Sequence, residues 1–166
     1  MIILKKSNPT DGPAAYITLA EIEEFSLCVA DVSRLAAASN DLKLRAARQA
    51  SDQIDMQRYA GKKASADQAR AFPRFKTGDP ETWKNGKPSH KNIGIPNAVK
   101  RACFYQMLSI IADPQRLARQ EARHDGIVSQ ANAGMSENYR LGPAEILCME
   151  AQRLLQPYKL KTGYIV

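Results

Sequence analysis

The amino-acid sequence predicts a mainly α-helical protein with a single domain of four or five helices. Apolar residues recur at helical spacing in several segments, and capping residues, Gly or Pro bound these segments. The chain has 166 residues, which is the length of one ordinary domain. We expect residues 1–157 to form a helical body, with a long basic loop inserted at 75–94 and an extended C-terminal tail at 158–166.

The first predicted helix begins after Thr18, because Thr18 and Glu21 have the spacing of a capping box. In this motif the Thr hydroxyl accepts a hydrogen bond from a backbone N–H of the first turn, and the Glu side chain accepts one from the backbone N–H of the Thr. We expect the helix to end near Ala30. Its apolar face is predicted to contain Leu19, Ile22, Phe25 and either Cys28 or Val29.

The second predicted helix begins near Ser39 or Asn40. Every fourth residue belongs to its buried stripe, which contains Leu42, Ala46, Ala50 and Ile54. The small Ala side chains in this stripe permit a close approach by another helix. Gly61 is predicted to cap the C-terminus of the helix.

A second capping box, from Ser65 to Gln68, predicts a short helix over 66–71. Pro73 ends this helix, because the residue before a proline is disfavoured in the helical conformation. We expect Phe72 and Pro73 to anchor the following loop on the core.

The third predicted helix has Pro96 at its first position and ends before 113–114. Its buried stripe is predicted to contain Val99, Cys103, Met107 and Ile110. The pattern of residues 115–141 does not decide between helix and strand. Residues 115–123 are consistent with a basic helical turn. Short strands are predicted at 127–128 or at 138–141.

The last predicted helix starts at the Gly-Pro pair at 142–143 and ends at Pro157. Its register contains Ile146, Leu147, Glu150 and Leu154. Of these residues, we expect Ile146 and Leu154 to be buried.

Positive charge is concentrated in the middle of the chain. The net charge is +7, yet the segment 58–101 alone holds eleven Lys or Arg residues and three acids, a surplus of eight. A basic block of this kind favours a polyanion or an acidic protein surface as partner. A solvated basic surface without a partner is the alternative.

The residues that usually carry chemistry are sparse. Cys28, Cys103 and Cys148 lie far apart with no CxxC spacing, and we expect all three to be buried free thiols. His90 lies in the basic loop and His124 in a charged stretch, and we expect both to be exposed polar residues and not metal ligands. No P-loop, GxGxxG or GxSxG motif is present in the sequence. We therefore predict no metal site, no cofactor and no enzyme activity.

The loop at 75–94 interleaves aromatic residues with cations. This composition is typical of surfaces that stack bases and neutralise phosphates, and it also suits contact with an acidic protein surface. The residues predicted to make these contacts are Lys76, Trp83, Lys84, Lys87 and Lys91.

Several short blocks occur in an order and spacing that point to one family. They are Ala15 to Glu21, Ile54-Asp55, Tyr59 to Lys63, Gln68, Phe72-Pro73-Arg74 and Ile95 to Ala102. Together they resemble the gp6-like head–tail connector (adaptor) proteins of tailed bacteriophages, a family also described as DnaT-like. Residues 124–140 are polar where this family commonly has a hairpin.

The resemblance implies a structural protein of the virion that is made in the host cytoplasm and assembled into the phage neck, with no membrane involved. Family members form a homo-oligomeric ring, commonly a dodecamer, beneath the portal protein. Such a ring extends the channel for the packaged double-stranded DNA and docks the next neck or tail protein. By the same resemblance, the C-terminal tail is expected to contact the portal through Tyr158, Lys159, Lys161 and Tyr164.

A second interpretation is a DnaT-like protein that binds single-stranded nucleic acid. The aromatic residues Phe75 and Trp83 within the basic loop support it. The two interpretations predict different behaviour in salt. A single-strand binder binds oligonucleotides tightly and loses affinity steeply as salt rises, whereas a connector oligomerises or binds the portal and has weak affinity for DNA.

Overall fold

The computed structural model describes most of the helical body and a few short strands. Side chains and backbone are described for residues 15–75, 94–113, 115 and 146–160. The backbone alone is described for the strands at 83–84, 87–88, 129–132 and 135–138. Within these residues, no helix combines the length and the apolar composition that a membrane span requires.

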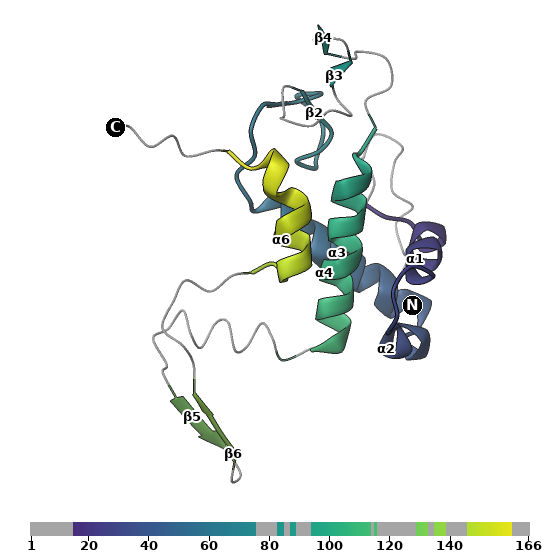
Figure 1. Ribbon diagram of the computed structural model, residues 1–166, viewed down its shortest axis with the longest axis vertical. Coiled ribbons are helices and arrows are strands. Elements are labelled where there is room, and N and C mark those ends of the chain that lie inside the picture. The colour runs from purple at the N-terminus through teal and green to yellow at the C-terminus, as the bar shows by residue number, and fades with distance from the viewer. Residues whose placement is uncertain are drawn as a thin grey trace, which may run out of the picture.

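In the described part of the chain, helix α4 (Asn97–Ala112) is the central element (Figure 1). Helices α3 (Asn40–Asp55) and α6 (Met149–Leu155) both pack along it. Helix α1 (Leu19–Ser26) contacts α3 and α4, and the short helix α2 (Ser33–Ala37) contacts α4. The protein is therefore mainly helical with a single domain, as the sequence predicts.

The start of α1 is confirmed and its end is not. Thr18 and Glu21 form both halves of the capping box, and Ile22 is buried. The helix ends at Ser26, before the predicted Ala30, so Cys28 follows in a turn and is exposed. The prediction that Cys28 is buried was wrong, because a helical stripe has no meaning beyond the last helical residue.

The short helix α2 was absent from the sequence prediction. Asp31 precedes it and accepts hydrogen bonds from the backbone N–H and the hydroxyl of Ser33, at 3.1 and 2.8 Å. Only Leu35 is buried among the five residues of this helix. A helix with one buried residue has no repeating apolar positions, so the sequence pattern did not reveal it.

Helix α3 begins after Ser39, whose hydroxyl accepts from the backbone N–H of Leu42. Ala46, Ala50 and Ile54 of the predicted stripe are buried, whereas Leu42 is 40% exposed. Burial in α3 therefore starts one turn later than predicted, at Ala46. The buried residues of α3 also include Ala47, Ser51 and Gln53.

Helix α4 is buried on more than one face, as its central position requires. Val99, Cys103 and Met107 are buried as predicted, and Ile110 is half-buried. Pro96 is the N-cap of the helix rather than its first residue. Ala102, Phe104 and Gln106 lie outside the predicted stripe and are buried as well, because α3 and α6 cover different sides of the helix.

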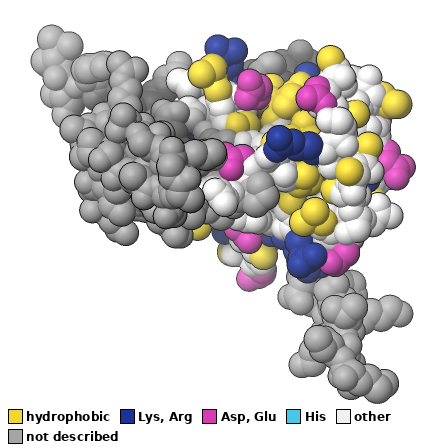
Figure 2. Space-filling view, turned by 90° about the horizontal axis from the view of Figure 1, so that it is seen from below, with side chains coloured by type: hydrophobic (Ala, Val, Ile, Leu, Met, Phe, Trp, Pro, Cys, Tyr) yellow, Lys and Arg dark blue, Asp and Glu magenta, His cyan; other side chains and the backbone are white. Residues whose placement is uncertain are grey.

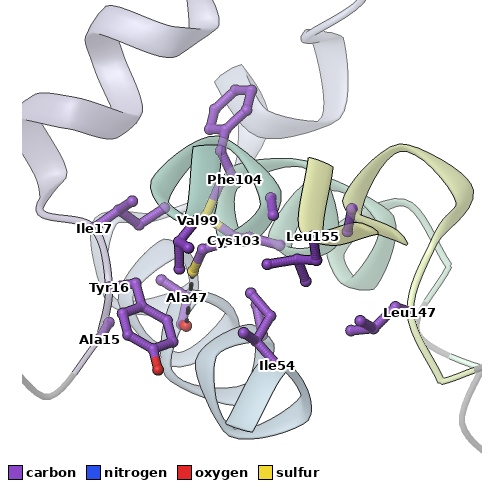
Figure 3. Close-up of a cluster of buried hydrophobic side chains, with 14 of the residues drawn as sticks. Ala15, Tyr16, Ile17, Ala47, Ile54, Val99, Cys103, Phe104, Leu147 and Leu155 are labelled. Carbon is purple, nitrogen blue, oxygen red and sulfur yellow. Dashed lines mark hydrogen bonds between the residues drawn. The ribbon is translucent and has the colours of Figure 1, made fainter. Parts of the chain in front are cut away.

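The Ala residues of α3 allow α3 and α4 to lie close together (Figure 3). The thiol of Cys103 donates to the backbone carbonyl of Ala47 across 3.6 Å, and Ala47 is fully buried. Burial raises the pKa of the Cys103 thiol to about 11, so the thiol is protonated at neutral pH. The predicted burial of Cys103 and Cys148 is confirmed.

Helix α6 starts later than predicted and in a different register. Leu147, Ala151 and Leu155 are buried at a spacing of four, while Ile146 and Leu154 are only half-buried. The prediction that Ile146 and Leu154 are buried was therefore wrong by one position. A stripe of adjacent apolar residues is ambiguous by one position until the partner helix is known, and the predicted start at 142–143 lies outside the described residues.

A buried amide links three elements of the body. The side-chain N–H groups of Gln106 donate to Gln53 Oε1 of α3 and to the Ile146 carbonyl, at 2.6 and 3.1 Å. Its side-chain oxygen accepts from the Cys148 N–H at 2.7 Å. Since Gln106 is only 1% exposed, these bonds replace the water that its amide would otherwise bind.

The described strands form three antiparallel pairs. They are β1 (Lys62–Lys63) with β2 (Arg74–Phe75), β3 (Trp83–Lys84) with β4 (Lys87–Pro88), and β5 (Ser129–Asn132) with β6 (Met135–Asn138). Figure 1 shows β5 and β6 at one end of the molecule, apart from the helices. The strand predicted at 127–128 lies outside the described residues, and of the strand predicted at 138–141 only Asn138 is described, as the last residue of β6. The β5–β6 pair lies in the polar segment 124–140.

The register of α3 can be tested by truncating two of its predicted stripe residues. Ile54 is fully buried, so Ile54→Ala is expected to lower the free energy of unfolding by about 2–5 kcal/mol. Leu42→Ala removes the same kind of side chain from an exposed site, so it is expected to change the free energy of unfolding by about 0.5 kcal/mol or less. Urea unfolding followed by circular dichroism measures both, and equal losses would contradict the observed burial.

Candidate nucleic-acid interface

The chain folds back on itself after α3. The helix ends at Asp55 and its C-cap is Met56, so the predicted cap, Gly61, lies beyond the helix. Gly61 has a φ of 75°, a left-handed conformation that Gly adopts without strain, and it leads into β1. Because β1 pairs with β2, residues 64–73 form a closed loop, which we call the α3 loop.

Arg74 holds the two ends of this loop together. Its guanidinium donates to four backbone carbonyls: Nε to Ala60, Nη1 to Ala71, and Nη2 to both Tyr59 and Gly61, at 2.7–3.3 Å. The planar fork of an Arg reaches several acceptors at once, which a Lys ammonium on a flexible stem cannot reproduce. The Arg74 charge is therefore used within the fold.

Gln68 replaces the short helix that was predicted over 66–71. Its side-chain oxygen accepts from the Ser65 N–H at 3.0 Å, as in a capping box. Its amide N–H groups, however, donate to the carbonyls of Arg70 and Pro73, at 2.9 and 3.0 Å, and these bonds close a turn. The helix prediction was wrong because a capping-box pattern also suits a loop in which the same side chain bonds forward.

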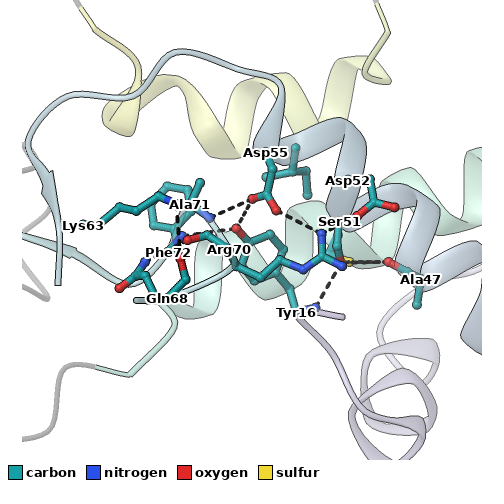
Figure 4. Close-up of polar contacts among 12 residues, drawn as sticks. Tyr16, Ala47, Ser51, Asp52, Asp55, Lys63, Gln68, Arg70, Ala71 and Phe72 are labelled. Carbon is teal, nitrogen blue, oxygen red and sulfur yellow. Dashed lines mark hydrogen bonds and ion pairs between the residues drawn. The ribbon is translucent and has the colours of Figure 1, made fainter. Parts of the chain in front are cut away.

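The Asp55 carboxylate ties the α3 loop to the helical body (Figure 4). It accepts hydrogen bonds from the Tyr16 hydroxyl and from the Ala71 N–H, the latter at 3.0 Å. Arg70 Nη1 lies 2.9 Å from Asp55 and 2.5 Å from Asp52. The Arg70 side chain is only 14% exposed, so this ion pair is shielded from solvent more than a surface pair.

Tyr16 connects the N-terminal segment to the same cluster. Its backbone N–H donates to Ser51 Oγ at 3.0 Å, and its hydroxyl accepts from the Phe72 N–H at 3.2 Å. Burial, and then the hydrogen bond to Asp55, raises the pKa of the Tyr16 phenol above its ordinary value of 10.0. The hydroxyl therefore stays protonated at neutral pH and remains a donor to the carboxylate.

The C-terminal segment docks beside the α3 loop through aromatic rings. The Phe72 ring packs edge-on against Tyr59 and Tyr158, with centroids 4.7 and 5.4 Å apart. Tyr158 lies at the end of the 3-10 helix η1 (Gln156–Tyr158). The predicted anchoring of Phe72 on the core is confirmed, since its side chain is only 2% exposed.

Backbone hydrogen bonds hold the residues that follow. Ala60 N–H donates to the Tyr158 carbonyl at 2.9 Å, Lys159 pairs with Tyr59 in an antiparallel bridge, and Leu160 N–H donates to the Arg58 carbonyl at 3.2 Å. Tyr158 is only 3% exposed. The expectation that Tyr158 lies in a tail and contacts the portal does not fit this position, because its ring fills the protein's own core.

An open groove with a volume of about 490 Å³ lies between the end of α3, the α3 loop and Leu160. Its lining includes the side chains of Arg58 and Lys63, which are exposed, and Gln57, which is half-buried. Asp55 is the single acid among the described residues of the lining, and its carboxylate is already paired with Arg70.

Two exposed cations line this groove, Arg58 and Lys63, and two more, Lys62 and Lys159, are chain neighbours of lining residues. We call these four residues the basic corner. The first three are exposed and Lys159 is half-buried. None of the four makes a salt bridge with an acid in the described part of the chain. Lys63 Nζ also donates to the Gln68 carbonyl of the α3 loop, at 3.2 Å. By contrast, Arg70 and Lys100 pair with carboxylates, with Lys100 Nζ lying 2.5 Å from the Glu21 carboxylate, and the Arg74 guanidinium binds several backbone carbonyls.

The structure places the predicted contact residues unevenly. The backbones of Trp83, Lys84 and Lys87 lie in β3 and β4, and their side chains are outside the described part. Lys159 belongs to the basic corner. The remaining predicted contacts, Lys76, Lys91, Lys161 and Tyr164, lie outside the described residues.

The described residues contain no group of three His, Cys, Asp or Glu side chains that is arranged to hold a metal ion. The exposed cations of the basic corner can bind an anionic partner by charge and hydrogen bonds.

A family model described as "Putative DnaT-like ssDNA binding protein" matches residues 2–162, nearly the whole chain. The chain belongs to this family. No curated protein and no solved structure matches it. The DnaT-like half of the resemblance is thus confirmed, and the head–tail connector half remains a prediction.

Sequence reasoning on this DnaT-like chain missed several residues of the groove. The predicted contacts did not include Gln57, Arg58 or Leu160. Leu160 lies more than ninety residues after the other two, and none of the three belongs to a recognisable motif. The surplus of positive charge, which begins at Arg58, was the available signal.

The role of Arg74 can be tested by a conservative substitution. Arg74→Lys keeps the charge but cannot reach all the carbonyls that the guanidinium binds, so it is expected to cost about 1–3 kcal/mol of unfolding free energy. Arg58→Lys, at an exposed site, serves as the control and is expected to change stability by about 0.5 kcal/mol or less. Urea unfolding measures both, and a tolerated Arg74→Lys would show that the clamp is dispensable.

Proposed function

We propose that the protein binds single-stranded DNA and that the basic corner contacts the phosphates. The observation that carries the proposal is the set of cations beside the groove that make no salt bridge with a described acid. Membership of a family described as DnaT-like and single-strand binding supports the same partner. The proposed role is binding alone, without a chemical reaction.

The electrostatics of the corner favour a flexible strand. Arg58, Lys63 and Lys159 come from three backbone segments that hydrogen bonds hold together. Each phosphate that a Lys or Arg neutralises releases counterions, and this gives a salt-dependent affinity that is independent of sequence. An unpaired strand can bend to follow cations that lie around a corner, whereas a stiff duplex cannot do so at low cost.

Removing two of these cations tests the proposal. Fluorescence anisotropy with a labelled oligo(dT) of roughly 20 nucleotides measures affinity as salt rises from about 50 to 200 mM. The double variant Lys62→Gln, Lys63→Gln is expected to weaken binding and to reduce the salt slope by about 1.4, since each lost phosphate contact removes about 0.7. A protein that binds no oligonucleotide at low salt would refute the proposal.

The matched control removes the same charge elsewhere. Arg101 of α4 and Arg153 of α6 are exposed and lie outside the groove lining. The double variant Arg101→Gln, Arg153→Gln is therefore expected to keep most of the affinity and the original slope. Equal losses in the two double variants would mean that net charge, and not the basic corner, attracts the DNA.

A second candidate function is the head–tail connector that the sequence resembles, and one observation favours it. A groove of about 300 Å³ between α2 and the end of α4 is lined by Val32, Leu35, Leu108 and Ile111. The acid in its lining, Asp31, is exposed. Figure 2, which views this end of the molecule, shows apolar side chains gathered across its face among mixed charges.

Two unlike surfaces on one subunit suit a head-to-tail contact. The groove beside the basic corner has the exposed apolar side chain of Leu160, and the α2–α4 groove is lined mostly by apolar residues together with Asp31 and Arg34. Contacts between different surfaces generate rings when the rotation closes. Under this proposal the protein is part of the virion, its ring extends the DNA channel beneath the portal, and Lys159, Lys161 and Tyr164 contact the portal.

Sedimentation of the protein at rising concentration separates the two candidates. A connector is expected to form a closed ring and to bind oligo(dT) weakly, whereas a single-strand binder keeps its steep salt dependence as a monomer. A tight dimer with a two-fold interface would refute the ring, because such an interface joins identical surfaces.

A further inference from the structure

The groove beside the basic corner is lined by cations, an amide and apolar side chains, together with the Asp55 carboxylate that Arg70 already pairs. Arg58 and Lys63 bring positive charge, and Gln57 brings an amide that both donates and accepts. Ala69 and Leu160 are the apolar residues of the lining, and we call them the apolar wall. A volume of about 490 Å³ lies within the range of pockets that take small organic ligands.

Leu160 is an unusual wall residue, because its side chain is 59% exposed while its backbone is anchored. Its N–H donates to the Arg58 carbonyl at 3.2 Å, and the neighbouring Lys159 is bridged to Tyr59. Two positions earlier, the buried Tyr158 ring fixes the segment to the core. An apolar side chain that is held at the mouth of a polar groove offers a surface that is ready to cover a flat ligand.

A single nucleotide has the features that such a groove recognises. Its phosphate suits the cations, and its base has a flat face that can leave water against an apolar wall. The edge of an unpaired base also carries free donors and acceptors, which an amide can bind. In a duplex, the partner strand already uses that edge and stacking holds the base in place.

We propose that this groove is a subsite for one unpaired nucleotide, and that Leu160 and Gln57 make the protein prefer single strands to duplex. The proposal rests on the proposed binding of single-stranded DNA and assigns the residues that select the form of the DNA. The phosphate lies beside Arg58 and Lys63, the base lies against Leu160, and Gln57 bonds to the base edge.

The test compares two ligands at one salt concentration. One is a labelled oligo(dT), and the other is a labelled duplex with the same number of phosphates. Leu160→Ser and Gln57→Ala are each expected to weaken oligo(dT) binding by about fivefold, because one base loses its contact. Duplex affinity is expected to stay within about twofold, since the duplex binds through its phosphates.

Met56→Ser is the matched control, because Met56 is 68% exposed and does not line the groove. It is expected to keep both affinities. Thermal unfolding checks that each variant is folded. If Leu160→Ser does not fold, Gln57→Ala still tests the proposal.

The outcomes separate this proposal from the proposed function. If the unmodified protein binds neither ligand, binding of DNA itself is refuted. If the unmodified protein binds oligo(dT) and both groove variants keep its preference for single strands, the groove is not the selective subsite. A preference that falls in both groove variants but not in Met56→Ser supports the assignment.

Discussion

At the end of α3, the Asp55 carboxylate joins segments that are far apart in the sequence. It accepts from Tyr16 before α1 and from Ala71 in the α3 loop, and it pairs with Arg70. These bonds seat Phe72 in the core, where the C-terminal ring of Tyr158 packs on it. The groove and the basic corner keep their shape because this carboxylate fixes the loop that forms one of their walls.

The cations of the central segment have two different roles, which composition alone does not separate. Arg70 pairs with the Asp55 and Asp52 carboxylates and Arg74 binds backbone carbonyls, so their charge stabilises the turn after α3. Arg58, Lys62 and Lys63 lie on the outside of the same turn and remain exposed. The inner cations position the outer ones, and a surface built this way presents its charge without having to order a flexible loop first.

The two candidate functions make different demands on the same structure. Single-strand binding uses the basic corner and its groove, where charge and an apolar wall lie side by side. A connector ring uses the basic corner together with the opposite α2–α4 groove, since each copy must present two unlike surfaces. Leu160 matters to both, either as a cover for a base or as an apolar contact with a neighbouring copy.

The sequence by itself determined the helical class and the features that depend on nearby residues. The capping box at Thr18, the cap at Ser39 and the buried positions Ile54, Val99 and Cys103 follow from local hydrogen bonds and from the period of one helix. Only the tertiary structure decided the rest: the exposure of Leu42 and Cys28, the register of α6, the turn at Gln68, the burial of Tyr158 and the groove. The exposure of Leu42, the register of α6, the burial of Tyr158 and the groove depend on which distant segment covers a side chain, and a one-dimensional pattern does not contain that information. The exposure of Cys28 and the turn at Gln68 are local, but there the same residue pattern suits both a helix and a turn.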